Sequence, residues 1–263
     1  MIRASAHLST LFADVPAPER PGLAAAAGYR LVESWWPAAE DHDALVAAVE
    51  AHGLRVVLVN ADCGDVRAGE RGFLNVPGRE EGELGRIDDA LALAARLGGA
   101  TVHVLVGIDT GEEPRATQLD RAVGTLREAV RRAETAGLDL VLENLNDRDT
   151  PGYLLPTCAD VARVLERVGS PRLRLLLDAY HVGALGLDVA AEIRRFASLA
   201  GHAQWAGVPG RQPPGRGTIP LGRVVELLAA AGYEGPLGLE HAATTREEAA
   251  LALALAEAPG LVG

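Results

Sequence analysis

The stretch that decides the fold class is Leu138-Asp139-Leu140-Val141-Leu142-Glu143, a short apolar run that ends on a carboxylate. The same pattern returns further along the chain as Leu173-Arg174-Leu175-Leu176-Leu177-Asp178. Strands that are buried on both faces of a parallel sheet have this short, nearly continuous apolar composition. Parallel strands need a long crossover connection, and the residues between these two runs are enough for one helix. The chain is therefore expected to repeat a strand–helix unit.

Strand and helix patterns alternate along the whole sequence. The predicted strands are Ile2 to Leu8, Arg30 to Val32, Leu54 to Val59, Thr101 to Val106, Leu138 to Leu142, Leu173 to Leu177, His202 to Gln204 and Leu237 to Leu239. The predicted helices include Asp43 to His52, Ile87 to Leu97, Leu119 to Thr135, Ala159 to Val168, Val189 to Leu199, Leu221 to Ala230 and Thr244 to Glu257. This order indicates eight strand–helix alternations.

Glycine residues support the predicted helix ends, because many helices end on a glycine in the left-handed conformation. These glycines are Gly53, Gly98, Gly137, Gly169, Gly201 and Gly232. An open doubly wound sheet would also alternate strands and helices, but it would normally carry Gly-x-Gly-x-x-Gly after its first strand, and this sequence has none there. We therefore predict an α/β protein, a closed (β/α)8 TIM barrel in a single domain over residues 1–263.

Composition restricts the class of protein further. The 263 residues fit one TIM barrel, and the 48% apolar content with only 4% aromatics favours a core of Leu, Val and Ala. A net charge of −11 repels polyanions, so nucleic-acid binding is disfavoured and a small-molecule substrate is favoured. The two cysteines do not form a framework, and the chain lacks a long apolar run or a signal-like N-terminus. These features predict a cytoplasmic protein without a membrane segment.

Four polar residues occupy the ends of the fifth to eighth predicted strands: Glu143, Asp178, Gln204 and Glu240. A single buried carboxylate at a strand end could simply cap a helix or pair with an Arg. Four such positions in consecutive repeats converge at one end of a barrel, where the carboxylates repel one another unless a cation holds them. Their ligand atoms are all oxygen, which favours Mg²⁺ or Mn²⁺ over a structural zinc.

Two predicted loops are longer than barrel loops usually are, namely Asn60 to Gly82 and Gly107 to Ala116. Both follow strands, so both are expected at the mouth of the barrel, where long loops are commonly lids or binding loops. We expect Asn60 to Gly82 to close over a bound substrate, with Glu70 and Arg71 shielding the reaction from water.

Several segments resemble those of the hydroxypyruvate isomerase family, within the xylose-isomerase-like TIM barrels. They are Glu143-Asn144-Leu145-Asn146, Asp178-Ala179-Tyr180-His181, Gly201-His202-Ala203-Gln204, Gly238-Leu239-Glu240 and the third-loop motif Ala68-Gly69-Glu70-Arg71-Gly72. The resemblance implies that Glu143, Asp178, Gln204 and Glu240 bind a divalent metal. It also implies that Glu143 and Glu240 form the acid–base pair that moves protons through an enediolate.

Other residues are candidates for substrate binding. His181 follows Asp178 by three residues and is placed to hydrogen-bond a substrate oxygen. Arg211 aligns with a recurrent arginine of the family and could hold a substrate carboxylate through its bidentate guanidinium. Arg71 and Glu70 are candidates from the third loop. His7 stands near the end of the first strand, where the family commonly has Asn.

These features favour an aldose–ketose type isomerase of a small hydroxy-oxo acid, with hydroxypyruvate to tartronate semialdehyde as the reaction that the resemblance implies. A 2-oxo-tetronate isomerase and a ketose 3-epimerase are the alternatives on the same site. An abasic-site endonuclease shares the superfamily fold but needs a basic groove for phosphates, against a net charge of −11. A non-catalytic barrel would not need both Glu143 and Glu240. The sequence leaves a homo-oligomer open.

Overall fold

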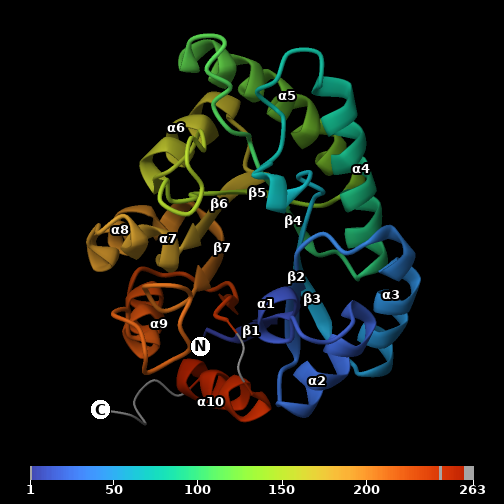
Figure 1. Ribbon diagram of the computed structural model, residues 1–263, viewed down its shortest axis with the longest axis vertical. Coiled ribbons are helices and arrows are strands. Elements are labelled where there is room, and N and C mark those ends of the chain that lie inside the picture. Colours follow the sequence, from blue (N-terminus) through green and yellow to red (C-terminus); the bar gives the residue numbers. More distant parts are fainter. Residues whose placement is uncertain (1, 243–244, 258–263) are drawn as a thin grey trace.

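The computed structural model describes residues 2–242 and 245–257, and their strands form one closed parallel barrel (Figure 1). Each strand pairs with its neighbours in chain order, and the last returns to the first. The strands are β1 Ala4–His7, β2 Leu31–Ser34, β3 Arg55–Asn60, β4 Thr101–Val104, β5 Leu140–Glu143, β6 Leu173–Asp178, β7 Ala200–Trp205 and β8 Leu237–Leu239. The predicted (β/α)8 TIM barrel is confirmed.

Helices surround the strands (Figure 1). The α-helices are α1 Leu8–Leu11, α2 Arg20–Ala26, α3 His42–Ala51, α4 Glu80–Arg96, α5 Arg115–Ala136, α6 Cys158–Val168, α7 Ala179–Ala184, α8 Val189–Phe196, α9 Leu221–Ala230 and α10 Arg246–Glu257. Single 3-10 turns are η1 Ala17–Glu19, η2 Ala39–Asp41, η3 Val66–Ala68 and η4 Ala197–Leu199. Among the described residues, the helices are all too short or too polar to cross a membrane.

Some predicted boundaries are wrong. Helix α4 begins at Glu80 and not at Ile87, because acidic side chains in its first turn stabilise a helix N-terminus without adding to the apolar periodicity. Gly201 does not end a helix and lies inside β7, packed so closely on Arg174 that a side chain would not fit. The start of the last predicted helix, Thr244, lies outside the described residues.

Helix ends at other glycines agree with the prediction. Gly137 and Gly169 take the left-handed conformation after α5 and α6. The start of α6 carries a reciprocal capping box, in which Thr157 accepts from the Asp160 backbone and Asp160 accepts from the Thr157 backbone. These ends determine where β5 and β6 enter the barrel.

Side chains alternate along each strand, so the side chains that point into the barrel form layers. Leu58, Val141 and Leu176 form a buried apolar cluster that is separate from the core between the barrel and its helices. Two residues further along their strands, β5 and β6 present Glu143 and Asp178 on the same face as that cluster. The polar layer at the carboxyl end therefore rests on an apolar layer.

Two long loops follow β3 and β4 and are joined to each other. They span residues 61–79 and 105–114, so the first is shorter than predicted because α4 begins early. Phe73 and Gly107 form an antiparallel bridge between them. Gly72 has a positive φ of 82°, and its backbone lies so close to the second loop that a Cβ would overlap a carbonyl oxygen there. The two loops pack as one structure beside the barrel mouth.

Candidate active site and metal centre

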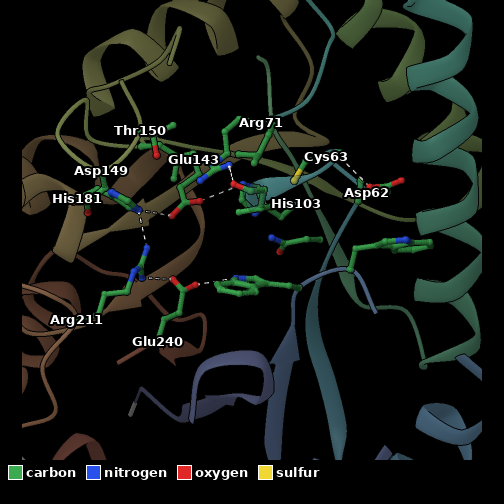
Figure 2. A pocket seen from close by; sticks show the side chains of 18 residues that line it. Asp62, Cys63, Arg71, His103, Glu143, Asp149, Thr150, His181, Arg211 and Glu240 are labelled. Carbon is green, nitrogen blue, oxygen red and sulfur yellow. Dashed lines mark hydrogen bonds and ion pairs between the residues drawn. The ribbon is translucent and has the colours of Figure 1, made fainter. Parts of the chain in front are cut away.

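A cavity of about 420 Å³ opens where the strands end. Figure 2 shows Glu143 and Glu240 reaching into it from β5 and from the residue after β8, together with His181 and Arg211. The third loop contributes Arg71 to its wall. This is the end of the barrel at which TIM-barrel enzymes place their chemistry.

Glu143 lies at the end of β5 and is almost completely buried. Its Oε2 is 3.4 Å from His103 Nε2 and its Oε1 is 3.6 Å from His181 Nε2. Among the described residues Oε1 has no hydrogen-bond partner, which is costly for a buried carboxylate oxygen. Burial raises the pKa of Glu143 well above its usual value, and repulsion from Asp178 and Glu240 adds to the rise.

Asp178 ends β6 and is completely buried. Its Oδ1 caps α7 by accepting from the Tyr180 backbone at 2.8 Å. Its Oδ2 has no hydrogen-bond partner within the part of the chain that the structure describes, and it lies 3.5 Å from His181 Nε2 and 3.8 Å from Arg211 Nη1. Burial raises the pKa of Asp178 to about 7, although Arg211 opposes the rise. The helix cap thus aims one oxygen away from the cap and toward the other polar groups.

These groups fit a divalent cation. Glu143, Asp178 and His181 lie together, and one polar side-chain atom of each lies within 4.8 Å of those of the other two. The two unpartnered carboxylate oxygens are the atoms that a cation would satisfy. The cluster contains two members of the predicted ligand set, Glu143 and Asp178. His181, which the sequence suggested as a substrate contact, lies beside them.

Glu240 follows β8 and has hydrogen-bond partners on both carboxylate oxygens. Trp35 Nε1 donates to Oε1 at 3.0 Å, and Arg211 Nη1 donates to Oε2 at 2.7 Å. His7 Nε2 lies 3.6 Å from Oε1. Burial alone would raise the pKa of Glu240, but Arg211, His7 and the hydrogen bond from Trp35 hold it below its usual value. Glu143 and Glu240 therefore sit in contrasting surroundings.

His181 projects from α7 with a defined tautomer. The Asn146 backbone N–H donates to Nδ1 at 3.1 Å, so Nδ1 carries no proton. Burial and the nearby charge of Arg211 lower the pKa of His181 well below its usual value, and the neutral ring then holds its proton on Nε2. A neutral imidazole accepts at one nitrogen only, so the 3.0 Å approach of Arg211 Nη2 to Nε2 is a close contact and not a second accepted hydrogen bond.

Arg211 lies in the loop after β7 and has a positive φ of 54°, which is uncommon for a residue with a side chain. Its guanidinium stacks over the Tyr180 ring at 4.5 Å and contacts Glu240 and Asp178. The Arg211 side chain thus points to the carboxylates of Asp178 and Glu240. Its expected contact with a substrate carboxylate stays a prediction.

The two candidates from the third loop, Arg71 and Glu70, have different surroundings. Arg71 lines the cavity, and its Nη1 donates to the carbonyl oxygens of Val66 at 3.0 Å and Glu70 at 2.6 Å. The Glu70 carboxylate accepts from the Asp65 backbone at 2.6 Å, so it holds the turn of the loop. Arg71 is therefore the member of the motif that lines the cavity.

Two further candidates lie deeper in the barrel. Gln204 is paired in register with Asp178 and donates from Nε2 to Glu33 Oε1 at 2.7 Å. His7 is completely buried and packs edge-on against Trp35, with ring centroids 5.6 Å apart. The hydrogen bond from Trp35 to Glu240 was not predicted from the sequence.

Comparison with known proteins identifies the family. The sequence matches the family model described as xylose isomerase-like TIM barrel over residues 21–257. A putative hydroxypyruvate isomerase of Streptomyces coelicolor is 36% identical over 256 residues, which cover 91% of this chain and 90% of that protein. The chain belongs to the hydroxypyruvate isomerase family. Membership in this family makes the protein an isomerase built on a xylose isomerase-like barrel.

Other proteins that are similar to this chain carry different names. A 2-oxo-tetronate isomerase of Cupriavidus necator is 34% identical over 241 residues, covering 92% of this chain and 93% of that protein. A crystal structure of AP endonuclease, family 2, from Brucella melitensis superposes with a TM-score of 0.90 at 33% identity, covering 99% of both chains. These similar proteins therefore share a fold and a family, but their names point to different substrates.

Proposed function

We propose that the protein is a metal-dependent isomerase of a small hydroxy-oxo acid, interconverting hydroxypyruvate and tartronate semialdehyde. The observation that carries the proposal is the pair of buried carboxylates, Glu143 and Asp178, whose unpartnered oxygens lie within reach of a common cation beside a cavity. Glu143, Asp178, Gln204 and Glu240 would hold Mg²⁺ or Mn²⁺. The named hydroxypyruvate isomerase relatives support the substrate class.

The reaction requires one proton to leave a substrate carbon and another to reach its neighbour. Glu143 and Glu240 come from different strands, so one can remove the proton and the other can return it. When bound, the divalent ion supplies positive charge that stabilises the developing oxyanions. The Nε2 proton of His181 is available to a substrate oxygen, since Asn146 holds the other ring nitrogen.

We assign the substrate carboxylate to Arg71. Arg211, the other arginine in the cavity wall, is already hydrogen-bonded to Glu240. Arg71 donates to backbone carbonyl oxygens, and among the described residues it forms no ion pair with a carboxylate. A charged guanidinium at a cavity wall without an acidic partner is a suitable site for an acidic substrate.

The test is proton NMR of the Mg²⁺-loaded protein in D₂O with hydroxypyruvate, a 2-oxo-tetronate and neutral ketoses. Formation of tartronate semialdehyde with solvent deuterium on one carbon supports the proposal. Turnover of the ketoses alone would contradict it.

Arg71→Gln separates acid from neutral substrates. Loss of a charge-assisted hydrogen bond should raise the KM for the acid by ~10- to 100-fold. Arg67→Gln is the matched control, because Arg67 lies exposed on the same loop and outside the cavity wall. Equal KM values for the Arg71 variant and wild type would remove Arg71 from substrate binding.

The 34% identity to a 2-oxo-tetronate isomerase favours that activity as the second candidate. Such a substrate presents the same carboxylate to Arg71 and differs in length. The ratio of kcat/KM for the two acids in the same NMR assay decides between them. A nicking assay on duplex DNA with an abasic site addresses the endonuclease alternative, for which we expect no cleavage because the net charge of −11 repels phosphates.

A further inference from the structure

A buried carboxylate outside the cavity wall is bound to one of the proposed metal ligands. Glu33 lies at the second-last position of β2 and exposes none of its surface. It accepts hydrogen bonds from side chains of two other strands, Ser5 on β1 and His202 and Gln204 on β7. Such a carboxylate inside the barrel connects strands that are distant in sequence.

The two oxygens of Glu33 have separate partners. Oε1 accepts from Gln204 Nε2 at 2.7 Å. Oε2 accepts from Ser5 Oγ at 2.6 Å and pairs with His202 Nε2 at 2.9 Å. On the side of β8, Gly238 packs so closely that a Cβ would overlap Oε1. The carboxylate is therefore held from several sides, and Oε1 is reserved for Gln204.

The charge of Glu33 determines how the Gln204 amide is turned. Ser5 Oγ, His202 Nε2 and Gln204 Nε2 all lie within hydrogen-bond distance of the Glu33 carboxylate, as expected around an ionised group. An ionised carboxylate only accepts hydrogen bonds. The amide must therefore present its NH₂ to Glu33, because the opposite orientation would place two oxygens against each other. The carbonyl oxygen of Gln204 is left for a different partner.

We propose that Glu33 is a positioning residue that orients the Gln204 amide so that its oxygen serves as a metal ligand. Metals of this class bind the carbonyl oxygen of an amide and not its nitrogen. Gln204 stands in register with Asp178, whose Oδ2 belongs to the candidate metal cluster. The inference rests on the proposed function, since it requires the metal site.

The experiment measures Mn²⁺ affinity by isothermal titration calorimetry. In Glu33→Gln the new amide can accept or donate, so Gln204 can turn either way. We expect Mn²⁺ to bind ~10- to 100-fold more weakly, which is the usual effect of removing a residue that hydrogen-bonds a metal ligand. Wild-type affinity in Glu33→Gln would overturn the inference. Absence of Mn²⁺ binding by the wild type would instead overturn the proposed function and, with it, the inference.

Ser5→Ala is the matched control. It removes a hydrogen bond to Oε2 and leaves the bond between Oε1 and Gln204 in place. If Glu33 only stabilised the barrel, Glu33→Gln and Ser5→Ala would both lower the melting temperature, and the two variants would bind Mn²⁺ with the same affinity. We expect Ser5→Ala to lower the melting temperature with Mn²⁺ affinity unchanged. A loss of affinity equal to that of Glu33→Gln would contradict a specific action on Gln204.

A double-mutant cycle with Gln204→Ala separates orientation from long-range charge. If Glu33 acts through the amide, Glu33→Gln should have no further effect on Mn²⁺ affinity once Gln204 is Ala. Additive losses would show that the charge of Glu33 acts directly on the metal, and the inference would fail. If a variant does not fold, a crystal structure of the Mn²⁺-bound wild type decides. Gln204 Nε2 on Glu33 with the carbonyl oxygen on Mn²⁺ is expected, and a turned amide would refute it.

Discussion

At the scale of single residues, Glu143 and Glu240 are two carboxylates with opposite surroundings. Glu240 has a hydrogen bond on each oxygen, from Trp35 and Arg211. Glu143 has a buried oxygen to which residues 2–242 and 245–257 offer no hydrogen bond. Environments that push two pKa values apart are typical of acid–base pairs, because one carboxylate must hold a proton while the other accepts one.

Glu143→Gln and Glu240→Gln should each lower turnover by ~10²- to 10⁴-fold, the usual contribution of a positioned acid or base. Metal affinity should fall modestly, since the amide keeps a carbonyl oxygen. We expect one of the two variants to lose isomerisation yet still exchange a substrate proton with D₂O, which NMR detects. The surface variant Glu50→Gln is the control, because Glu50 is exposed on α3 and lies outside the cavity wall. Near wild-type turnover in both Gln variants, with metal bound, would rule out the two-base mechanism.

Asp178 connects protonation with folding stability. Its pKa of about 7 lies above the usual value for an aspartate, so the folded protein binds a proton that the unfolded chain releases. The stability contributed by this proton is present at low pH and is lost as the pH rises through 7. In chelator, Asp178→Asn should therefore become more stable than wild type by on the order of a few kcal/mol at pH 8.

Urea unfolding of the two proteins between pH 5 and pH 8 measures this difference. The comparison cancels the contributions of titratable groups that are distant from Asp178, because both proteins share them. A difference in the free energy of unfolding that does not grow with pH would show that Asp178 is ionised throughout. With Mn²⁺ present the wild type should become the more stable protein, because Asp178→Asn removes a charged ligand.

At the scale of elements, strand ends were predictable and loop contacts were not. Glu143 and Asp178 could be predicted to meet because parallel strands end at one edge of the barrel. The hydrogen bond from Arg211 to Glu240 depends on the loop after β7, in which Arg211 itself has a positive φ. The hydrogen bond from Trp35 to Glu240 joins residues that are distant in the sequence. Such contacts depend on loop conformation, which apolar periodicity does not encode.

The loop between β3 and α4 should become more protected when substrate binds. Its Arg71 is proposed to contact the substrate, and its bridge to the next loop gives it a defined closed position. We expect slower amide hydrogen exchange over residues 60–82 with saturating hydroxypyruvate, and no change in α6, which lies outside the cavity wall. Unchanged exchange in the loop would indicate a wall that is already closed.

At the scale of the whole molecule, one ion per chain should hold four strands together. The proposed ligands come from the ends of β5, β6 and β7 and from the residue after β8. Mn²⁺ at 100 times its Kd would stabilise the fold by ~2.7 kcal/mol, because it binds the folded chain only. For a chain of this size we expect the melting temperature to rise by ~5 °C or more.

Differential scanning calorimetry with Mn²⁺, and with chelator as the control, measures that rise, while calorimetric titration counts the ions. Asp178→Ala should abolish most of the rise. A stoichiometry other than one per chain, or a rise that Asp178→Ala retains, would place the ion at a different site.

The contact between Arg211 and Glu240 also sets an electroneutrality condition. Glu143, Asp178 and Glu240 together carry three negative charges when ionised, and the Arg211 guanidinium at 2.7 Å from Glu240 balances one of them. The remainder equals the charge of one divalent ion. These charges then sum to zero, so together they do not repel an acidic substrate, and Arg71 in the wall of the same cavity can attract it.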